Sequence, residues 1–208
     1  MGHIKKIEKQ TDNKFLNLCH IDFKDRAGAD RDYYFVSRRD EEHIKIRTRE
    51  MTPEGIVIYA VTREEEPRLV MVKEYRFPLD EEIYELPAGL IDPGETPGTA
   101  AARELKEVTG VHFTEYEGGE SFYRRPFCLV PGFSDETGTA VFGYADDLDG
   151  QKDNETSEWI EVVLADRNEV QRILKEERVS LRGAYLMFEF LRADNKKSPF
   201  AFLEGKTE

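Results

Sequence analysis

Several charged residues in the stretch GLIDPGETPGTAAARELKEVTGV, which runs from Gly89 to Val111, have the types and spacing of a metal or phosphate site. They are Glu95, Arg103, Glu104 and Glu107. In a helix, Glu104 and Glu107 fall on one side and position 108 lies beside them. Carboxylates stacked in this way repel one another unless a cation lies between them. Hard oxygen ligands at this spacing suit Mg²⁺ or Mn²⁺ and a substrate that contributes phosphate oxygens.

Arg103 comes directly before these carboxylates. Its guanidinium donates through a rigid planar fork, and we expect this fork to hold a carboxylate such as Glu95 in place. The alternative interpretation is an ordinary solvated helix whose glutamates face water.

Local signals predict the element that carries these side chains. The turn Asp92-Pro93-Gly94 leads through Thr96-Pro97 into a segment rich in helix-forming residues, and Gly110 follows that segment. Proline at the start and glycine at the end are typical of an α-helix, so we expect a helix that ends at Gly110.

The whole stretch resembles the signature of the Nudix hydrolase family. That signature is Gly, five residues, Glu, seven residues, then Arg-Glu-aliphatic-any-Glu-Glu-any-Gly-aliphatic. Eight of its nine specified positions agree with this chain. The nine are Gly89, Glu95, Arg103, Glu104, Leu105, Glu107, Val108, Gly110 and Val111. The disagreement is Val108, where the family has a second glutamate.

Val108 has two interpretations. The resemblance implies that a metal ligand has been lost, because the family's residue at this position typically contacts more than one metal ion. Losing one carboxylate from a Mg²⁺ site built mostly of carboxylate, water and phosphate weakens metal binding without necessarily abolishing it. Alternatively, Val108 follows Leu105 by three residues and extends an apolar stripe into the core.

Segments before the signature resemble the ADP-ribose pyrophosphatase branch of the family. Residues 74–78 read EYRFP and residues 84–89 read YELPAG. The resemblance implies that the carbonyl of Ala88 is a metal ligand and that Arg76 and Glu85 lie near a bound nucleotide.

A segment after the signature, PGFSDE at residues 131–136, is similar to the PGxxxE segment of the same branch. By spacing alone, Pro126 would be the branch's marker proline. By local motif the marker is Pro131, which we favour because a glycine and an acid follow it. The resemblance then places Pro131 and Glu136 among the substrate-binding residues.

A further carboxylate is expected before the last strand, because in-line attack on phosphorus needs a base or a water-orienting acid. Residues 153–162 are similar to the acid-rich loop and strand of the branch; Glu158 aligns best and Glu155 is the second candidate. A mobile acidic loop without a catalytic role is the alternative. Trp159 and Phe122 have faces suited to stacking on adenine, although core packing is the commoner role of such residues.

The resemblance implies a Mg²⁺-dependent hydrolase, with Mn²⁺ as the other suitable ion, that splits ADP-ribose or a related nucleoside diphosphate sugar into a nucleoside monophosphate and a sugar phosphate. The predicted catalytic residues are Glu158, Glu155, Arg103 and Glu107. The predicted substrate-binding residues are Arg76, Glu85, Pro131 and Glu136, and the predicted metal ligands are Ala88, Glu104 and Glu107. Two other hypotheses stay open: a domain that binds a nucleotide sugar without turnover, and a purely structural or partner-binding domain.

Composition limits the partners. The net charge of -13, from 43 Asp and Glu against 30 Lys and Arg, argues against binding to a nucleic-acid backbone. Cys19 and Cys128 form no metal-binding spacing, and no run of 18 apolar residues is present. We therefore expect a cytoplasmic protein with no membrane span and no secretion signal.

Alternating strand patterns and helical segments predict an α/β fold, and the resemblance specifies a Nudix α/β/α sandwich with a mixed β-sheet and an N-terminal β-hairpin subdomain. In this branch the hairpin is a dimerisation element, which implies a homodimer. The expected domains are 1–50 (hairpin), 51–195 (Nudix) and 196–208 (flexible tail). Strands are expected at 14–23, 33–37, 55–61, 68–75, 112–116, 139–144 and 159–164, and further helices at 168–176 and 180–192.

Overall fold

The computed structural model forms two compact units. The residues that it describes are 3–146, 159–193 and 198–204. The first unit, here called the N-terminal unit, combines Met1–Glu54 with Pro126–Gly138. The second, here called the box unit, combines Gly55–Arg125 with Thr139–Glu208 and contains the Gly89–Val111 stretch. Residues 126–138 fall within the second domain expected from sequence, 51–195, whereas their contacts assign them to the N-terminal unit.

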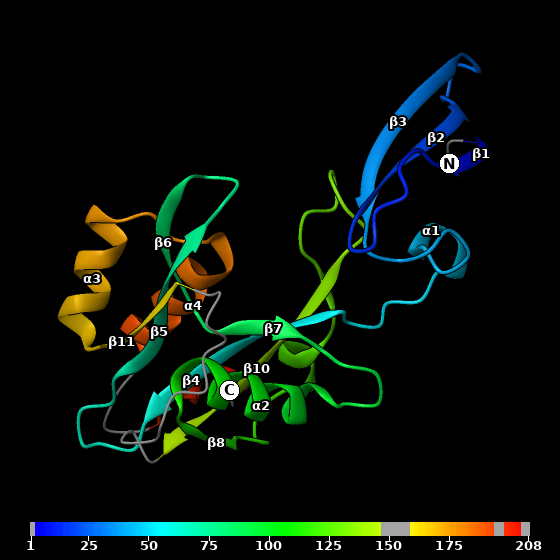
Figure 1. Cartoon of the computed structure of the whole chain (residues 1–208). Helices are drawn as coiled ribbons and strands as arrows, with labels where there is room; N and C mark the ends of the chain where they lie inside the picture. The colour runs from blue at the N-terminus through cyan, green and yellow to red at the C-terminus, as the bar shows by residue number, and fades with distance from the viewer. Residues whose placement is uncertain (1–2, 147–158, 194–197, 205–208) are drawn as a thin grey trace. The chain divides into compact units, whose positions relative to one another are not determined.

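The N-terminal unit is built on an antiparallel three-stranded sheet in the order β1-β2-β3 (Figure 1). Its strands are β1 (His3–Lys9), β2 (Asn17–Lys24) and β3 (Asp30–Ser37). The predicted hairpin corresponds to β2 and β3, which turn at Gly28 with a φ of 82°, a conformation that favours glycine. β1 was not predicted, because its lysines interrupt the apolar alternation.

A small core lies against this sheet and the short helix α1 (Lys45–Thr48). Cys19, Phe35 and Ile44 are buried there. The two-residue strand β9 (Phe127–Cys128) pairs with the first residues of β10 (Thr137–Asp146). A bridge between Val36 and Ser134 joins the chain segment 126–138 to β3 of this unit.

The box unit is built on a mixed sheet whose main path runs β11-β5-β4-β10-β8 (Figure 1). β6 and β7 pair with β5 and β4. The strands are β4 (Gly55–Thr62), β5 (Leu69–Arg76), β6 (Glu81–Glu85), β7 (Ala88–Leu90), β8 (His112–Glu115) and β11 (Ile160–Ala165). The predicted α/β class with a mixed sheet is confirmed.

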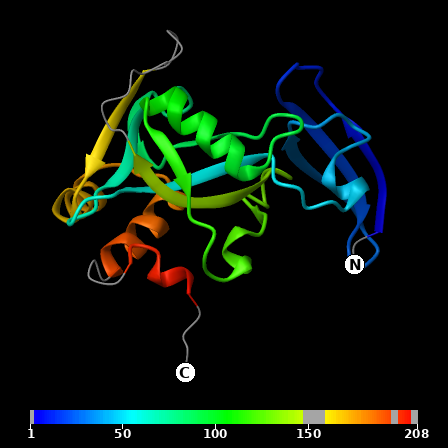
Figure 2. The same ribbon diagram turned by 90° about the horizontal axis from the view of Figure 1, so that it is seen from below.

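Alternation along β4 gives the sheet two apolar faces, because successive side chains of a strand point to opposite sides. Ile56 and Ile58 pack with Leu105 of α2 (Pro97–Thr109). Tyr59 and Val61 belong to the other cluster, on the side of α4. Figure 2 shows α2 on one side of the sheet and α4 with the C-terminal segment on the other.

Three C-terminal elements cover the second face. They are α3 (Arg167–Glu176), α4 (Leu181–Arg192) and the 3₁₀ helix η2 (Ala201–Leu203); a further 3₁₀ helix, η1 (Ser121–Arg124), follows β8. Asp166 and Ser180 cap α3 and α4 through their side chains. The described part of the expected flexible tail is packed: Phe200 and Leu203 are fully buried, because they complete this core.

Phe200 sits among aromatic rings. Its ring stacks on Tyr116 with centroids 4.5 Å apart and meets Tyr59 and Tyr144 edge-on at 6.0 and 5.0 Å. Such a ring contributes both buried apolar area and aromatic contacts.

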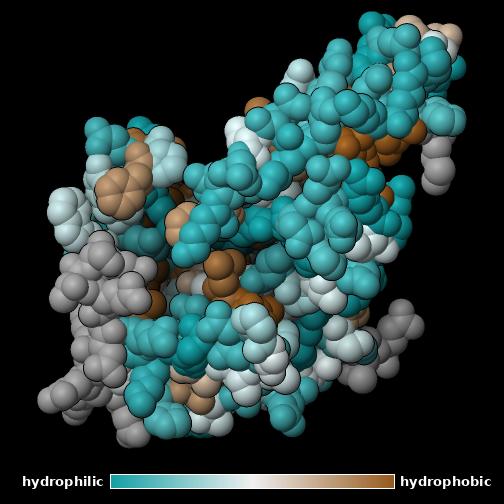
Figure 3. All heavy atoms as spheres, turned by 45° about the vertical axis from the view of Figure 1, so that its right-hand side comes forward, coloured by the Kyte–Doolittle hydropathy of each residue, from teal (hydrophilic) through white to brown (hydrophobic). Residues whose placement is uncertain are grey.

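Several large apolar side chains of the N-terminal unit are exposed, and Figure 3 shows apolar surface on this unit beside polar surface. They are Ile4, Phe15, Leu16, Leu18, Met51, Phe127, Val130 and Phe133. Within the described residues, no helix has both the length and the apolar character needed to cross a bilayer.

Replacing Phe200 by alanine is expected to lower the free energy of unfolding by about 3–5 kcal/mol, the usual cost of removing a fully buried phenylalanine ring. Urea unfolding followed by circular dichroism measures this loss. Leu181→Ala is the control, because Leu181 is 74% exposed and should change stability by less than about 0.5 kcal/mol. Equal stability of the two variants would contradict the packing of the C-terminal segment.

Candidate functional site

The helix α2 begins and ends where its local sequence dictates. Thr96 is the N-cap and exchanges hydrogen bonds with Thr99, and Pro97 occupies the first turn. Gly110 closes the helix in the left-handed conformation with a φ of 73°. This confirms the predicted helix and places Arg103, Glu104 and Glu107 on one rigid element, with Glu95 in the turn before it.

Arg103 is the centre of the site. Its Nε and Nη2 donate to the two carboxylate oxygens of Glu95 at 2.9 and 2.8 Å, which is the bidentate pairing expected from the sequence. Nη1 donates to Glu104 at 2.9 Å and to Glu107 at 3.2 Å. Nη2 also donates to the carbonyl oxygen of Leu90 at 3.0 Å. One guanidinium thus gathers three carboxylates and the end of β7.

Charge pairing changes the acidity of Glu95. The hydrogen bonds from Arg103, followed by one from the backbone N–H of Asp92, lower the pKa of Glu95 from 4.5 to about 2. The same pairing raises the pKa of Arg103. Glu95 therefore serves as a permanently charged support of the turn rather than as a proton carrier at neutral pH.

Gly89 and Glu104 are in close contact. A Cβ added at Gly89 would lie 1.9 Å from Cδ of Glu104, so only glycine leaves room for this carboxylate against β7. The Glu104 side chain is 15% exposed, and its predicted metal partner Ala88 is the neighbour of Gly89 in the same strand. Ala88 is therefore adjacent in β7 to the glycine that contacts Glu104.

Position 108 differs from its neighbours in burial. Leu105 is fully buried, Val108 is half-buried and the Glu107 side chain is 51% exposed. Among the described residues, no three His, Cys, Asp or Glu side chains form a group that could hold a metal ion by themselves.

Arg76 and Glu85, the predicted substrate residues of the box unit, contact one another. Arg76 Nε donates to Glu85 at 2.5 Å, and its Nη1 lies 2.6 Å from a carboxylate oxygen of Glu74. Glu85 is almost completely buried, whereas the Arg76 side chain is 39% exposed. The buried carboxylate orients the arginine and leaves part of its guanidinium surface accessible.

Pro131 and Glu136, the other two predicted substrate residues, belong to the N-terminal unit. Glu136 accepts a hydrogen bond from Arg38 Nε at 3.2 Å. Pro131 lines a cavity of about 360 Å³ in this unit, together with Tyr33, Phe35 and Met51 among others.

The predicted catalytic acids Glu155 and Glu158 lie outside the described residues. Their neighbour Trp159 is 71% exposed, and its ring meets Tyr75 at 5.4 Å. Phe122 is 51% exposed and packs on Tyr123. Neither ring is a core residue, which was the alternative favoured from sequence.

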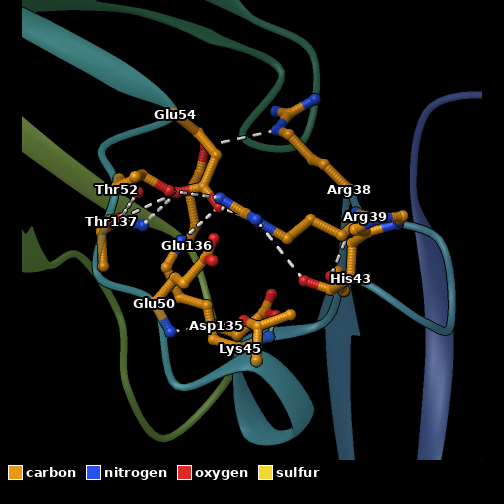
Figure 4. A network of polar contacts seen from close by, with 12 residues as sticks. Arg38, Arg39, His43, Lys45, Glu50, Thr52, Glu54, Asp135, Glu136 and Thr137 are labelled. Atoms are coloured by element: carbon orange, nitrogen blue, oxygen red, sulfur yellow. Dashed lines mark hydrogen bonds and ion pairs between the residues drawn. The ribbon is translucent and has the colours of Figure 1, made fainter.

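A second charged cluster was not anticipated from sequence. Glu54 accepts hydrogen bonds from Arg39, Lys45 and Thr137 within the N-terminal unit (Figure 4). The residues around Glu54 give no signal for this cluster, because its partners Arg39 and Thr137 are distant in the sequence.

Known proteins are similar to this chain over part of its length. The family model described as the NUDIX domain matches residues 51–185. A methanol dehydrogenase activator from Bacillus methanolicus is 32% identical over 144 residues, covering 67% of this chain and 72% of that protein. An ADP-ribose pyrophosphatase from Bacillus subtilis is 39% identical over 84 residues, covering 40% and 42% of the two chains.

Among solved structures, the crystal structure of an ADP compounds hydrolase superposes with a TM-score of 0.64 at 18% identity, covering 90% of each chain. At that identity the likeness concerns the fold.

The Glu95–Arg103 pair predicts a pH dependence of stability. Because the folded-state pKa of Glu95 is about 2 and its ordinary value is 4.5, the pair stabilises the fold fully above pH 4.5. This contribution is lost as the pH falls through the window toward 2. The melting temperature of Glu95→Gln should therefore lie below that of the natural protein at neutral pH, and the difference should shrink on acidification.

Thermal unfolding from about pH 7 to about pH 3 measures this difference. Glu65→Gln, which changes an exposed glutamate in the β4–β5 turn, is the control and should show a small difference at every pH. A difference for Glu95→Gln that stays constant with pH would rule out the charged pair as its cause.

Proposed function

The chain belongs to the Nudix hydrolase family, and from this premise we propose that it hydrolyses the pyrophosphate bond of ADP-ribose or a related nucleoside diphosphate sugar. The products would be a nucleoside monophosphate and a sugar phosphate. Water adds to one phosphorus atom, the bridging P–O bond breaks, and the proton of the water passes to a base. The similarity to ADP-ribose pyrophosphatases supports this substrate class.

One observation carries the proposal: Arg103 gathers Glu104 and Glu107 on the same nitrogen. Two carboxylates held on one side of a rigid helix, beside Gly89 and the strand that contains Ala88, make an electronegative oxygen-rich site. In an ordinary solvated helix, the glutamates would face water independently and would not share one arginine nitrogen.

The oxygen ligands available here are of the type that magnesium and manganese ions prefer. Glu104, Glu107 and the carbonyl of Ala88 would hold the ion, and water and substrate phosphate would supply the other ligands. The room that Gly89 leaves for the Glu104 carboxylate is the structural observation that favours this assignment. Bound Mg²⁺ would neutralise negative charge that develops on the bridging and leaving oxygens.

The protein's own residues would bind and orient the substrate. Arg76, fixed by Glu85, presents a partly exposed guanidinium that suits a phosphate or a ribose oxygen. Pro131 and Glu136, which lie in the PGFSDE segment at residues 131–136, would contact the nucleotide sugar. Glu158, or Glu155 in its place, would accept the proton of the attacking water.

A binding module without turnover is the second candidate, and Val108 favours it. The half-buried valine supplies no oxygen where the family has a carboxylate. Such a module would keep the nucleotide site and bind ADP-ribose without metal and without product.

We also propose that the protein is a cytoplasmic homodimer. Both cysteines are free thiols, which suits a reducing compartment. The exposed apolar side chains of the N-terminal unit, Phe15 and Phe133 among them, are the kind of surface that a second copy covers.

The proposal is tested by measuring monophosphate release from ADP-ribose with saturating Mg²⁺ or Mn²⁺. The natural protein should turn over, and Glu104→Gln should lose about 100-fold in kcat/KM, since it removes a central ligand. Val108→Glu is the informative companion. A rate close to that of the natural protein would mean that the site functions without an acid at position 108.

Activity in Val108→Glu alone, combined with calorimetric binding of ADP-ribose to the natural protein, would instead establish the binding module. Absence of both turnover and binding across a panel of nucleoside diphosphate sugars would end the proposal.

Gly89→Ala should weaken Mn²⁺ binding by about 10-fold or more, because the added methyl group displaces the Glu104 carboxylate. Electron paramagnetic resonance of free Mn²⁺ measures the affinity without any need for turnover. Gly132→Ala is a size-matched control, since a Cβ there comes no closer than 3.9 Å to another atom. Equal affinities for the two variants would contradict the role of Glu104 as a ligand.

A further inference from the structure

The cavity of about 360 Å³ in the N-terminal unit lies wholly within that unit. Its lining residues come from both parts of the unit, the first 54 residues and the segment 126–138. Cavities of roughly 300–1,000 Å³ with mostly apolar walls are typical of small-molecule sites. The cavity is therefore large enough for a small organic ligand, and no part of the box unit is needed to complete it.

Apolar side chains form most of its walls. Ile21 and Phe35 are buried and belong to the small core of this unit. Tyr33 and Met51, which also line the cavity, are 42% and 47% exposed. The apolar area of these two side chains lies in water, so covering it with an apolar ligand is favourable.

Hydrogen bonds hold the two parts of the lining together. The hydroxyl of Tyr33 donates to the carbonyl of Gly132 at 2.7 Å, and the backbone N–H of Lys45 donates to Asp135 at 3.0 Å. The ammonium of Lys45 pairs with Glu54, which also accepts from Arg39. The walls are thus fixed before any ligand arrives, which reduces the entropy that binding must overcome.

Arg49 is the cation of this cavity that is available to a ligand. Lys45 is occupied by Glu54, whereas Arg49 forms no ion pair with any residue that the structure describes. A guanidinium donates through a planar fork whose geometry matches a carboxylate. Asp135 is the one acidic side chain in the lining, so an anionic group would be attracted to Arg49 and repelled from Asp135.

The backbone at Arg49 adds to this picture. Arg49 follows α1 as its C-cap, and its N–H donates to the Lys45 carbonyl at 2.8 Å. Its φ of 64° is in the left-handed region, where glycine or asparagine is the usual residue. An arginine at this position therefore costs local stability, and it brings a charged fork to the cavity.

We propose that this cavity binds a small monocarboxylate with an apolar body. The carboxylate pairs with Arg49, and the apolar chain or ring covers Tyr33, Phe35 and Met51. One negative charge matches one available arginine, while Asp135 disfavours a ligand with more negative charge. The site does not depend on the proposed function. Pro131 lines the same cavity and is assigned above to the nucleotide sugar, so the two ligands must be tested against each other.

Cys128 reports whether the cavity is occupied. Its exposed thiol lines the cavity, whereas Cys19, the other cysteine, is 1% exposed. Iodoacetamide should alkylate Cys128 first in the full natural chain, and a bound ligand should slow this reaction. Octanoate and 3-phenylpropionate are the probes for an aliphatic and an aromatic body. Mass spectrometry of the Cys128 peptide measures the rate, and calorimetry measures the dissociation constant.

The charge of the probe tests the role of Arg49. Octan-1-ol and octylammonium have an apolar chain of the same length without the carboxylate, and they should bind about 10-fold more weakly than octanoate. Arg49→Asn should weaken octanoate binding by about 10-fold and leave octan-1-ol binding within about twofold. Asparagine tolerates the left-handed conformation, so this variant should fold, which circular dichroism checks.

Arg26→Asn is the matched control. Arg26 is an exposed arginine in the turn between β2 and β3 of the same unit, and it is not among the lining residues. The control removes the same charge and should leave the dissociation constant of octanoate within about twofold.

Three results would overturn the inference. Neither carboxylate might slow alkylation or give heat of binding, in which case the site does not exist. Equal binding of octanoate and octylammonium, or an unchanged dissociation constant in Arg49→Asn, would remove Arg49 as the carboxylate partner. Protection of Cys128 by ADP-ribose as strong as that by octanoate would assign the cavity to the nucleotide instead. The proposed function is judged separately, by the release of monophosphate from ADP-ribose.

Discussion

The guanidinium of Arg103 uses all five of its N–H donors, and the rest of the box depends on this saturation. Two bonds go to Glu95, one each to Glu104 and Glu107, and one to the carbonyl of Leu90. One positive charge thus joins a turn, a strand end and a helix. Three carboxylates surround it, so the group keeps an excess of negative charge. The interaction that stabilises the local fold therefore also leaves a negative charge on this cluster.

The sheet of the box unit carries this site on one face only. Ile56 and Ile58 direct β4 against α2, whereas Val57 between them and Tyr59 after them point to the face that the C-terminal elements close. The alternation of side chains along β4 therefore places the cluster around Arg103 and the core formed by α4 and Phe200 on opposite faces of the sheet. Changes on the second face can alter stability without touching the residues that Arg103 organises.

Local signals explain which parts were predictable from sequence. The helix α2 has its cap at Thr96, its proline at 97 and its glycine at 110, all within one short stretch, and the fork of Arg103 has a clear chemical partner in Glu95. The contact of Glu54 with Thr137 joins residues 83 positions apart, and their spacing in the sequence does not predict it.

Weak patterns account for the remaining differences. Strand β1 is interrupted by lysines, and β9 has only two residues. Phe200 belongs to a five-residue apolar run, Pro199 to Leu203, between charged flanks, and a run this short does not identify its partners in the core. Long-range complementarity of this kind is decided by tertiary packing.

The N-terminal unit is discontinuous, because Pro126–Gly138 completes a structure begun by Met1–Glu54. This has a consequence for how such a protein can be recombined. A crossover at residue 54 would deliver a sheet without the segment that caps α1, and would leave Asp135 and Thr137 in a host that lacks their partners. The two pieces can be exchanged between relatives only together, so they should be inherited as a linked pair although the whole box helix lies between them in the chain.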